Sequence, residues 1–305
     1  MPSSSKPLPP PGLARRLLKS PTAWGSLLIL ALLILSAFLA PLFSSTDPHA
    51  TSSLQFSPPS LAHPFGTDVN GRDLLSRVLE GARISLLVGL SGALVSFTIG
   101  TAYGLVSGYI GGRVDALMMR LVEVLYAIPR LILIIIAFFV FDPVLKKSLA
   151  DLWDGRLVGY SKILILILAL GLIEWLTMAR IVRGQVLALK NQQFVLAARS
   201  LGQSHLQIIL RHLLPNLLGV VVVYLTLTVP AVILDESFLS FLGLGVQPPQ
   251  ASWGSLLADG AQVINPVRSY WWLLIFPAVF MSATLLALNF LGDGLRDALD
   301  PRQKR

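Results

Sequence analysis

The sequence predicts an all-α membrane protein folded as a bundle of six transmembrane helices, and two observations lead to this fold class. Of the 305 residues, 54% are hydrophobic and only 13% are charged, whereas a soluble domain carries about 25% charged residues. Six windows are also apolar enough to cross the hydrocarbon core of a bilayer, which takes about 20 helical residues. These windows are Ser20–Thr46, Ile84–Gly112, Ala116–Phe141, Ile163–Ala179, Leu213–Leu234 and Ser269–Gly292.

The N-terminal region divides into a tail, an anchor and a connector. Residues 1–22 are predicted to form a disordered cytoplasmic tail. Their first part is rich in Pro and Ser and has few apolar side chains that a folded core could bury. Residues 23–43 are expected to form the first transmembrane anchor. Their apolar run, Trp24–Ala40, exceeds the roughly 7–15 residues of a secretory signal, so a retained anchor is favoured. The Ser- and Pro-rich stretch after it predicts an extracytoplasmic connector over residues 44–83.

Residues 84–292 are expected to form the core of the bundle, with five transmembrane helices. Two of its windows carry acidic residues, Glu123 and Glu174. A charge at the bilayer centre costs about 2.5–3.5 kcal/mol on insertion scales, so each is expected to face the bundle or lie near a membrane surface. Both are candidates for lining a pathway, although Glu174 lies close to Arg180 and an interfacial position fits it too. Kinks are expected at the prolines inside the spans, Pro129, Pro230 and Pro277.

The basic residues indicate how the bundle is oriented. With the N-terminus placed in the cytoplasm, 15 of the 24 Lys and Arg residues lie on the cytoplasmic side and 8 outside, with Arg130 within a span. This bias follows the positive-inside rule and predicts that both termini are cytoplasmic, including a tail over residues 293–305. The net charge of +8 is spread along the chain rather than gathered in one patch, so no nucleic-acid partner is expected.

The longest predicted cytoplasmic loop, residues 180–212, has the pattern of two short helices. Phe194, Ala198 and Leu201 are spaced to line one helix face, and Gly202 can adopt the left-handed conformation that ends a helix.

A second short helix is expected directly after this glycine. Ser204 and Gln207 have the spacing of a capping box, and Leu214-Pro215 leads into the next span. Two helices that meet at a glycine corner would form a rigid knob, which can dock into a groove on a partner. Small residues such as Ala197 and Ala198 are also common where helices simply pack closely, and the loop alone leaves that alternative open.

The loop resembles the coupling loop of ABC importer permeases, whose pattern is Glu-Ala-Ala-x3-Gly-x9-Ile-x-Leu-Pro. The spacing is the same here, with Leu196 in place of the glutamate and His212 in place of the isoleucine. The resemblance implies contact with an ATPase subunit. The residues that it assigns to this ATPase-coupling loop are Phe194, Ala197, Ala198, Arg199, Gly202, Gln203, Ser204, His205, Leu214 and Pro215.

Three further segments resemble the second permease subunit of dipeptide, oligopeptide and nickel importers. They begin Phe65-Gly66-Thr67-Asp68, Ser237-Phe238-Leu239-Ser240 and Asn289-Phe290-Leu291-Gly292. The resemblance implies the six-helix fold of type I ABC importer permeases, with residues 84–292 as the permease core. It also implies a multi-pass protein of the bacterial inner membrane.

The resemblance further implies that the chain forms half of the translocation pathway of an ATP-driven, binding-protein-dependent importer of di- or oligopeptides. The expected partners are a second homologous permease subunit, two ATP-binding subunits that carry ATP and Mg²⁺, and an extracytoplasmic solute-binding protein. Nickel chelates, glutathione or another small solute are the alternative cargoes. A self-contained secondary transporter is a further alternative, but it would require paired charges within the membrane and an inverted repeat, and the sequence shows neither.

Catalytic and metal chemistry find little support in the sequence. There is no cysteine, no Gly-x4-Gly-Lys-Ser/Thr phosphate loop and no Gly-x-Ser-x-Gly or His-Glu-x-x-His motif. The chain is therefore expected to be a transporter subunit with no catalytic residue, metal site or bound cofactor of its own. The histidines lack ligand spacing; they are His49, His63, His205 and His212.

Two acidic motifs are interpreted as structural. Asp68, Arg72 and Asp73 have the spacing of a local salt-bridged turn rather than an acid–base pair. Asp235-Glu236, at the end of the fifth window, is expected to be solvated or to pack against a neighbouring subunit.

Overall fold

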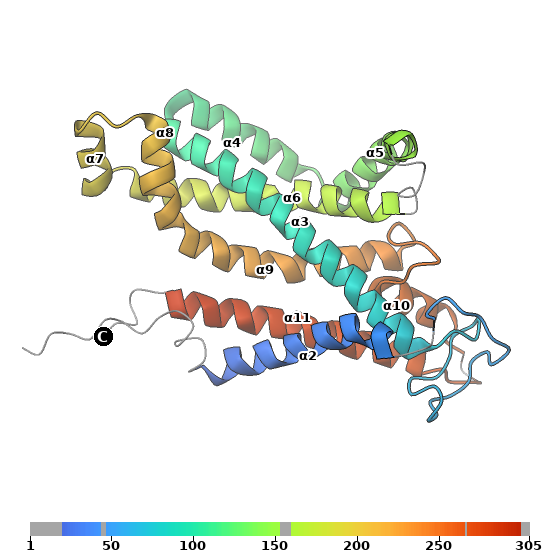
Figure 1. Ribbon diagram of the computed structural model, residues 1–305. Coiled ribbons are helices and arrows are strands. Elements are labelled where there is room, and N and C mark those ends of the chain that lie inside the picture. Colours follow the sequence, from blue (N-terminus) through green and yellow to red (C-terminus); the bar gives the residue numbers. More distant parts are fainter. Residues whose placement is uncertain (1–19, 44–46, 153–159, 266, 300–305) are drawn as a thin grey trace, which may run out of the picture.

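The computed structural model describes residues 20–43, 47–152, 160–265 and 267–299 (Figure 1). The predicted tail over residues 1–22 therefore lies mostly outside the described residues, as do residues 300–305. Within the described ranges the chain is helical, apart from turns, loops and one isolated bridge between Thr67 and Asp73.

The helices account for the apolar windows of the sequence. Among the described residues, five helices are long and apolar enough to cross a membrane, or six if the bent pair α4 and α5 forms one span, as the predicted fold class requires. The elements are α2 (Pro21–Phe43), α3 (Leu74–Ile110), α4 (Gly112–Ala127), α5 (Arg130–Leu152), α6 (Ser161–Leu189), α7 (Gln193–Ser200), α8 (His205–Ile208), the π-helical turn η2 (Ile209–Leu213), α9 (Leu214–Phe241), α10 (Trp253–Gln262) and α11 (Trp272–Leu299).

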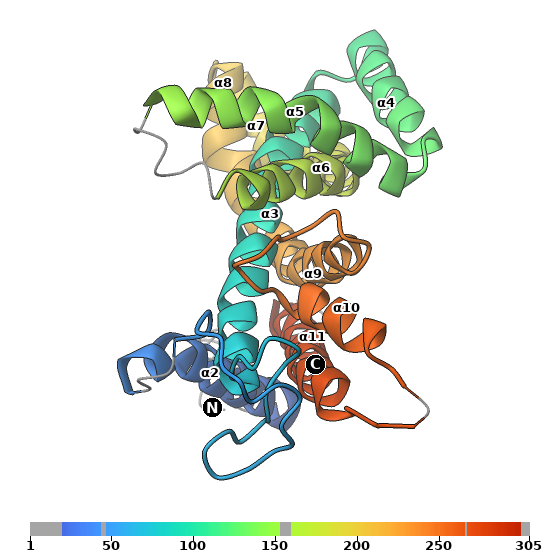
Figure 2. The ribbon, with the colours of Figure 1, turned by 90° about the vertical axis from the view of Figure 1, so that its right-hand side faces the viewer.

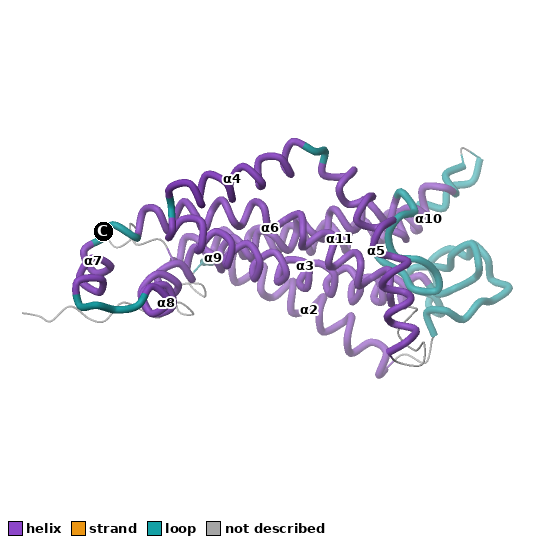
Figure 3. The backbone as a smooth tube through the Cα atoms, turned by 90° about the horizontal axis from the view of Figure 1, so that it is seen from above, coloured by secondary structure: helices purple, strands orange, loops and turns teal. Residues whose placement is uncertain are grey.

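The third span is not the continuous helix that the window Ala116–Phe141 predicts. It breaks between α4 and α5, and the two helices are bent by 93° (Figure 3). Pro129 explains the break, because proline has no N–H for the helix and disfavours helical geometry in the residue before it. Ile128 is accordingly extended, with φ −84° and ψ 130°. The predicted kink at Pro129 is thus a sharp corner, whereas Pro230 and Pro277 lie inside continuous helices.

Several helices extend beyond the predicted boundaries. Helix α3 begins at Leu74, inside the predicted connector, where the Asp73 carboxylate accepts a hydrogen bond from the Ser76 N–H. Helix α11 continues to Leu299, so residues 293–299 are helical rather than a separate tail. Polar residues continue these helices past their apolar windows, because helix geometry does not require an apolar side chain at every position.

The sequence analysis did not predict helix α10. Ser252 and Ser255 form a capping box at its start, and its Trp253 is fully buried against α3 and α9. The helix is only 10 residues long and lies outside every apolar window, so hydropathy could not indicate it.

The connector folds back onto the start of α3 through charged groups. The Asp68 carboxylate accepts hydrogen bonds from Arg72 Nε at 2.7 Å and Arg77 Nη1 at 2.6 Å, and all three side chains are largely buried. Trp272 Nε1 of α11 donates to the backbone carbonyl of Thr67 at 3.3 Å. The predicted salt-bridged turn is confirmed, and it also joins the connector to α11.

Helix α3 is the central element of the bundle, and Figure 2 shows it between α6 and α2. It packs against α6 along a line of small residues that permits close backbone contact. A Cβ added to Gly104 would lie 2.5 Å from the Ala179 carbonyl oxygen and 2.8 Å from Val182 Cβ. At Gly171 of α6, an added Cβ would lie 2.8 Å from the Gly92 carbonyl oxygen of α3. We call this contact the glycine seam.

Adding a methyl group within the glycine seam should destabilise the bundle. Gly104→Ala is expected to cost about 1–3 kcal/mol, the usual range for overpacking, because the new methyl group meets backbone atoms that cannot move aside. Gly184→Ala is the matched control, since Gly184 lies in α6, the helix that Gly104 contacts, but an added Cβ there meets nothing within 4 Å. The thermal midpoint of the protein in detergent should fall for Gly104→Ala only. Equal midpoints for the two variants would contradict the close contact.

Candidate functional site

One end of the bundle carries a projecting helical corner (Figure 1). We call Gln193–Ile208, which comprises α7, the turn after it and α8, the knob. Gly202 forms the corner with φ +75°, in the left-handed region, as the sequence predicts. Ser204 Oγ accepts a hydrogen bond from the Gln207 N–H, and Gln207 Oε1 accepts one from the Ser204 N–H, so the predicted capping box is also confirmed.

The inner face of the knob is anchored in the bundle by apolar contacts. Val195, Ala198 and Ile208 are buried, and they pack in one cluster with Val186 of α6 and Leu217 of α9. Phe194 is half-buried on the same cluster. The knob is therefore joined to two long helices at once.

Leu201 departs from the prediction. The sequence spacing put it on one face with Phe194 and Ala198, but helix α7 ends at Ser200 and Leu201 is 81% exposed. Gly202 turns the chain directly after it, so the helical spacing no longer applies. Ala197, Arg199 and Leu206 are exposed as well, which leaves the outer face of the knob open to contact.

A polar contact joins the knob to the end of α3. The Tyr109 hydroxyl and His205 Nδ1 lie 2.8 Å apart, and the Arg199 guanidinium lies 5.9 Å from the centroid of the Tyr109 ring. Lys190 Nζ donates to the Gly108 carbonyl oxygen at 2.8 Å. Sequence reasoning missed Tyr109, because nothing in its local pattern indicates a partner 96 residues away.

The remaining predicted residues of the coupling loop lie where the knob meets α9. Gln203 Oε1 and His212 Nε2 are 2.8 Å apart, so this pair ties the corner to the π-helical turn η2. Leu214 is half-buried and Pro215 is exposed at the start of α9.

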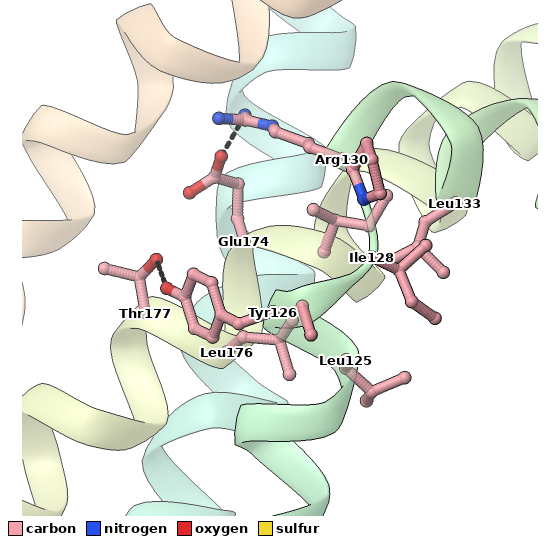
Figure 4. Close-up of a pocket in the computed structure, with 11 residues that line it drawn as sticks. Leu125, Tyr126, Ile128, Arg130, Leu133, Glu174, Leu176 and Thr177 are labelled. Atoms are coloured by element: carbon pink, nitrogen blue, oxygen red, sulfur yellow. Dashed lines mark hydrogen bonds and ion pairs between the residues drawn. The ribbon is translucent and has the colours of Figure 1, made fainter.

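A second site lies within the membrane-spanning region, where three ionisable side chains meet. Arg130, at the start of α5, donates a hydrogen bond to Glu174 of α6 (Figure 4). It also donates one to Asp235 of α9. We call these three residues the charge triad. The sequence analysis found no paired charges within the membrane, and that interpretation was wrong because the partners lie on three separate helices.

The triad shows which groups of the chain Glu174 and Asp235 contact. Glu174 lies near the middle of α6, about 20 Å from either end at 1.5 Å per residue, and its carboxylate meets Arg130 of α5. Its place in a pathway or at a membrane surface stays a prediction. Asp235 is paired with Arg130, and Glu236 is fully buried, with Ser85 Oγ at 2.9 Å and Ser240 Oγ at 2.7 Å from its carboxylate. Solvation is therefore wrong for Glu236, whereas Asp235 is half-buried in an ion pair; packing of these acids against a neighbouring subunit stays a prediction.

A pocket of about 220 Å³ opens beside the triad at the break between α4 and α5. Arg130 and Glu174 line it, together with Tyr126, whose hydroxyl bonds to the Thr177 hydroxyl (Figure 4). Glu123 does not line it and is exposed on α4, so the two acidic residues predicted as pathway candidates are not brought together. Within the described ranges, no group of three or more acidic or histidine side chains is arranged to hold a metal ion.

Sequence comparison assigns the family. Residues 100–305 match the binding-protein-dependent transport system inner membrane component, and residues 13–64 match the N-terminal transmembrane domain of oligopeptide transport permease C. The chain belongs to this family of inner-membrane transport components. The family match includes both the knob and the charge triad.

Individual relatives match nearly the whole permease. It is 47% identical to the dipeptide transport system permease protein of Bacillus subtilis over 95% of this chain and 85% of the relative. It is 48% identical to the oligopeptide transport system permease protein of Escherichia coli K12, over 95% of this chain and 90% of the relative. The resemblance seen in the sequence is confirmed.

Removing one hydroxyl tests the contact between α3 and the knob of the permease. Tyr109→Phe should raise the amide exchange rates of the knob about two- to tenfold, because a hydrogen bond contributes about 0.5–1.5 kcal/mol. Tyr224→Phe, which removes a hydroxyl from α9 outside the knob, is the control. Hydrogen–deuterium exchange of the purified protein gives the rates. Unchanged exchange in Tyr109→Phe would show that the contact does not hold the knob in place.

Proposed function

We propose that this permease is a transmembrane subunit of an ATP-driven, binding-protein-dependent importer of di- and oligopeptides. The observation that carries the proposal is the 47–48% identity, over 95% of the chain, to permease proteins of dipeptide and oligopeptide transport systems. The chain forms half of the translocation pathway. Nickel chelates or glutathione remain the alternative cargoes of the same machinery.

The knob is the proposed contact with an ATPase subunit. Its outer face is exposed, while its inner face packs against α6 and α9 and bonds to Tyr109 of α3. A partner that moves the knob therefore pulls on three membrane helices together. The residues proposed for this coupling are Phe194, Ala197, Ala198, Arg199, Gly202, Gln203, Ser204, His205, Leu214 and Pro215.

The assembly has further proposed members. A second, homologous permease completes the pathway, two ATP-binding subunits hold ATP and Mg²⁺ at the knob side, and a solute-binding protein delivers cargo at the opposite side. The start of α2 and the end of α11 lie at the same end of the bundle as the knob (Figure 1), which supports cytoplasmic termini. Closure of the ATP-binding pair supplies the differential free energy that shifts the bundle between its two open states.

Purification and transport together test this function. A tag on the C-terminal residues should co-purify a second permease and ATP-binding subunits from native membranes in mild detergent. The purified assembly in proteoliposomes, supplied with its binding protein, should take up a peptide only when ATP is present on the knob side. A chain that purifies alone and transports without ATP would contradict the proposal and favour a secondary transporter.

The glycine corner should be required for coupling. Gly202→Val should lower the amount of peptide transported per ATP hydrolysed, because a left-handed conformation costs an L-residue about 1–2 kcal/mol and a β-branched one more. Gly202→Asn is the matched control, since asparagine tolerates this conformation. An added Cβ meets nothing within 4 Å, so the effect isolates backbone geometry. Undiminished coupling in Gly202→Val, with normal membrane insertion, would show that the corner is dispensable.

A further inference from the structure

The charge triad carries one more negative charge than positive charge. Arg130 supplies one positive charge, and Glu174 and Asp235 supply two negative charges. The side chains of both acids are largely shielded from solvent, at 11% and 19% exposure. A carboxylate in this position is costly unless a further cation compensates it.

The backbone around the triad is also shaped like a binding site. Backbone that is not helical is tolerated at membrane depth only where protein buries it or where it lines a cavity, and broken helices mark substrate sites in several transporters. Here the break at Ile128-Pro129 opens onto the pocket that Arg130 and Glu174 line. The pocket therefore combines space for a ligand with a carboxylate, Glu174, that shares its one cationic partner with a second acid, Asp235.

We propose that this pocket binds the terminal ammonium group of the transported peptide, with Glu174 as the main partner and Asp235 beside it. The proposal rests on the proposed function and assigns a contact within the pathway. An ammonium group has three N–H donors and bonds strongly to carboxylate oxygens, which are acceptors only. Its single positive charge brings the triad to neutrality.

The walls of the pocket fit a peptide better than an isolated inorganic cation. Most of the lining is apolar and includes Leu125, Ile128, Leu133 and Leu176. The first side chain of a bound peptide would contact this apolar surface, which does not select for one side-chain shape. A divalent cation takes six or more oxygen ligands, whereas the side chains that line the pocket offer one carboxylate, Glu174, and the hydroxyls of Tyr126 and Thr177, which bond to each other. The site thus recognises a feature that free-amino peptides share, without selecting their sequence.

The experiment uses the assembled importer in nanodiscs without its binding protein, so that recognition by that protein does not contribute. The probe is Ala-(p-benzoyl-Phe)-Ala at millimolar concentration. It is photolysed in the presence of the assembly, and the residues of the permease that it labels are identified by mass spectrometry. We expect labelling within Leu125–Leu133 or Ile173–Thr177. Trialanine should compete about tenfold better than N-acetyl-trialanine, as expected when a charge-assisted hydrogen bond is lost.

Two variants and one control complete the test. Glu174→Gln should abolish the difference between the two competitors, and Asp235→Asn should reduce it. Asp142→Asn removes a carboxylate that pairs with Lys146 within α5 and does not line the pocket, so it should change nothing. Co-purification of the other subunits verifies that each variant assembles.

The outcomes separate this inference from the proposed function. If wild-type proteoliposomes take up peptide with ATP, but the two competitors are equivalent or the label lies elsewhere, the ammonium site is wrong and the importer stands. If the wild-type assembly with its binding protein takes up no peptide, the proposed function fails first. A competitor difference that survives in Glu174→Gln would overturn the assignment of Glu174.

Discussion

The close contact between α3 and α6 holds the two ends of the molecule in a fixed relation. Lipid tails are as apolar as the side chains, so helices in a membrane associate chiefly through van der Waals contact and hydrogen bonds rather than the hydrophobic effect. Glycines such as Gly104 bring the two backbones together over much of a helix about 55 Å long, at 1.5 Å for each of 37 residues. Asp73 caps one end of α3, and Tyr109 meets the knob at the other. A stiff pair of helices can transmit a displacement along its whole length.

The third span, unlike α3 and α6, is not a continuous helix. Pro129 interrupts the helix inside the bundle, and the first residue after it, Arg130, reaches two carboxylates on other helices. These contacts hold α5 against α6 and α9 without a continuous helix through the corner. The bundle therefore has one part held by close backbone contact and one part held by ion pairs between side chains.

The sequence predicted the features that depend on local pattern and missed those that depend on which helices meet. Apolar length indicated the spans, and the capping box at Ser204 was found because both partners lie within one turn. The sequence interpretation of Glu174 and Asp235 used only their neighbours along the chain. Their common partner, Arg130, lies 44 and 105 residues away. Buried Glu236 likewise depends on Ser85, 151 residues away on α3.

The most direct test of the account is a cross-link from the outer face of the knob. The chain contains no cysteine, so Leu201→Cys introduces a single reactive thiol at an exposed position. In native membranes, a thiol-reactive photo-cross-linker at this position should join the permease to an ATP-binding subunit. Leu61→Cys, which is also exposed but lies in the connector at the other end, should not capture that subunit. Capture of the ATP-binding subunit from Leu61→Cys, or its absence from Leu201→Cys in the intact assembly, would contradict the knob as the coupling element.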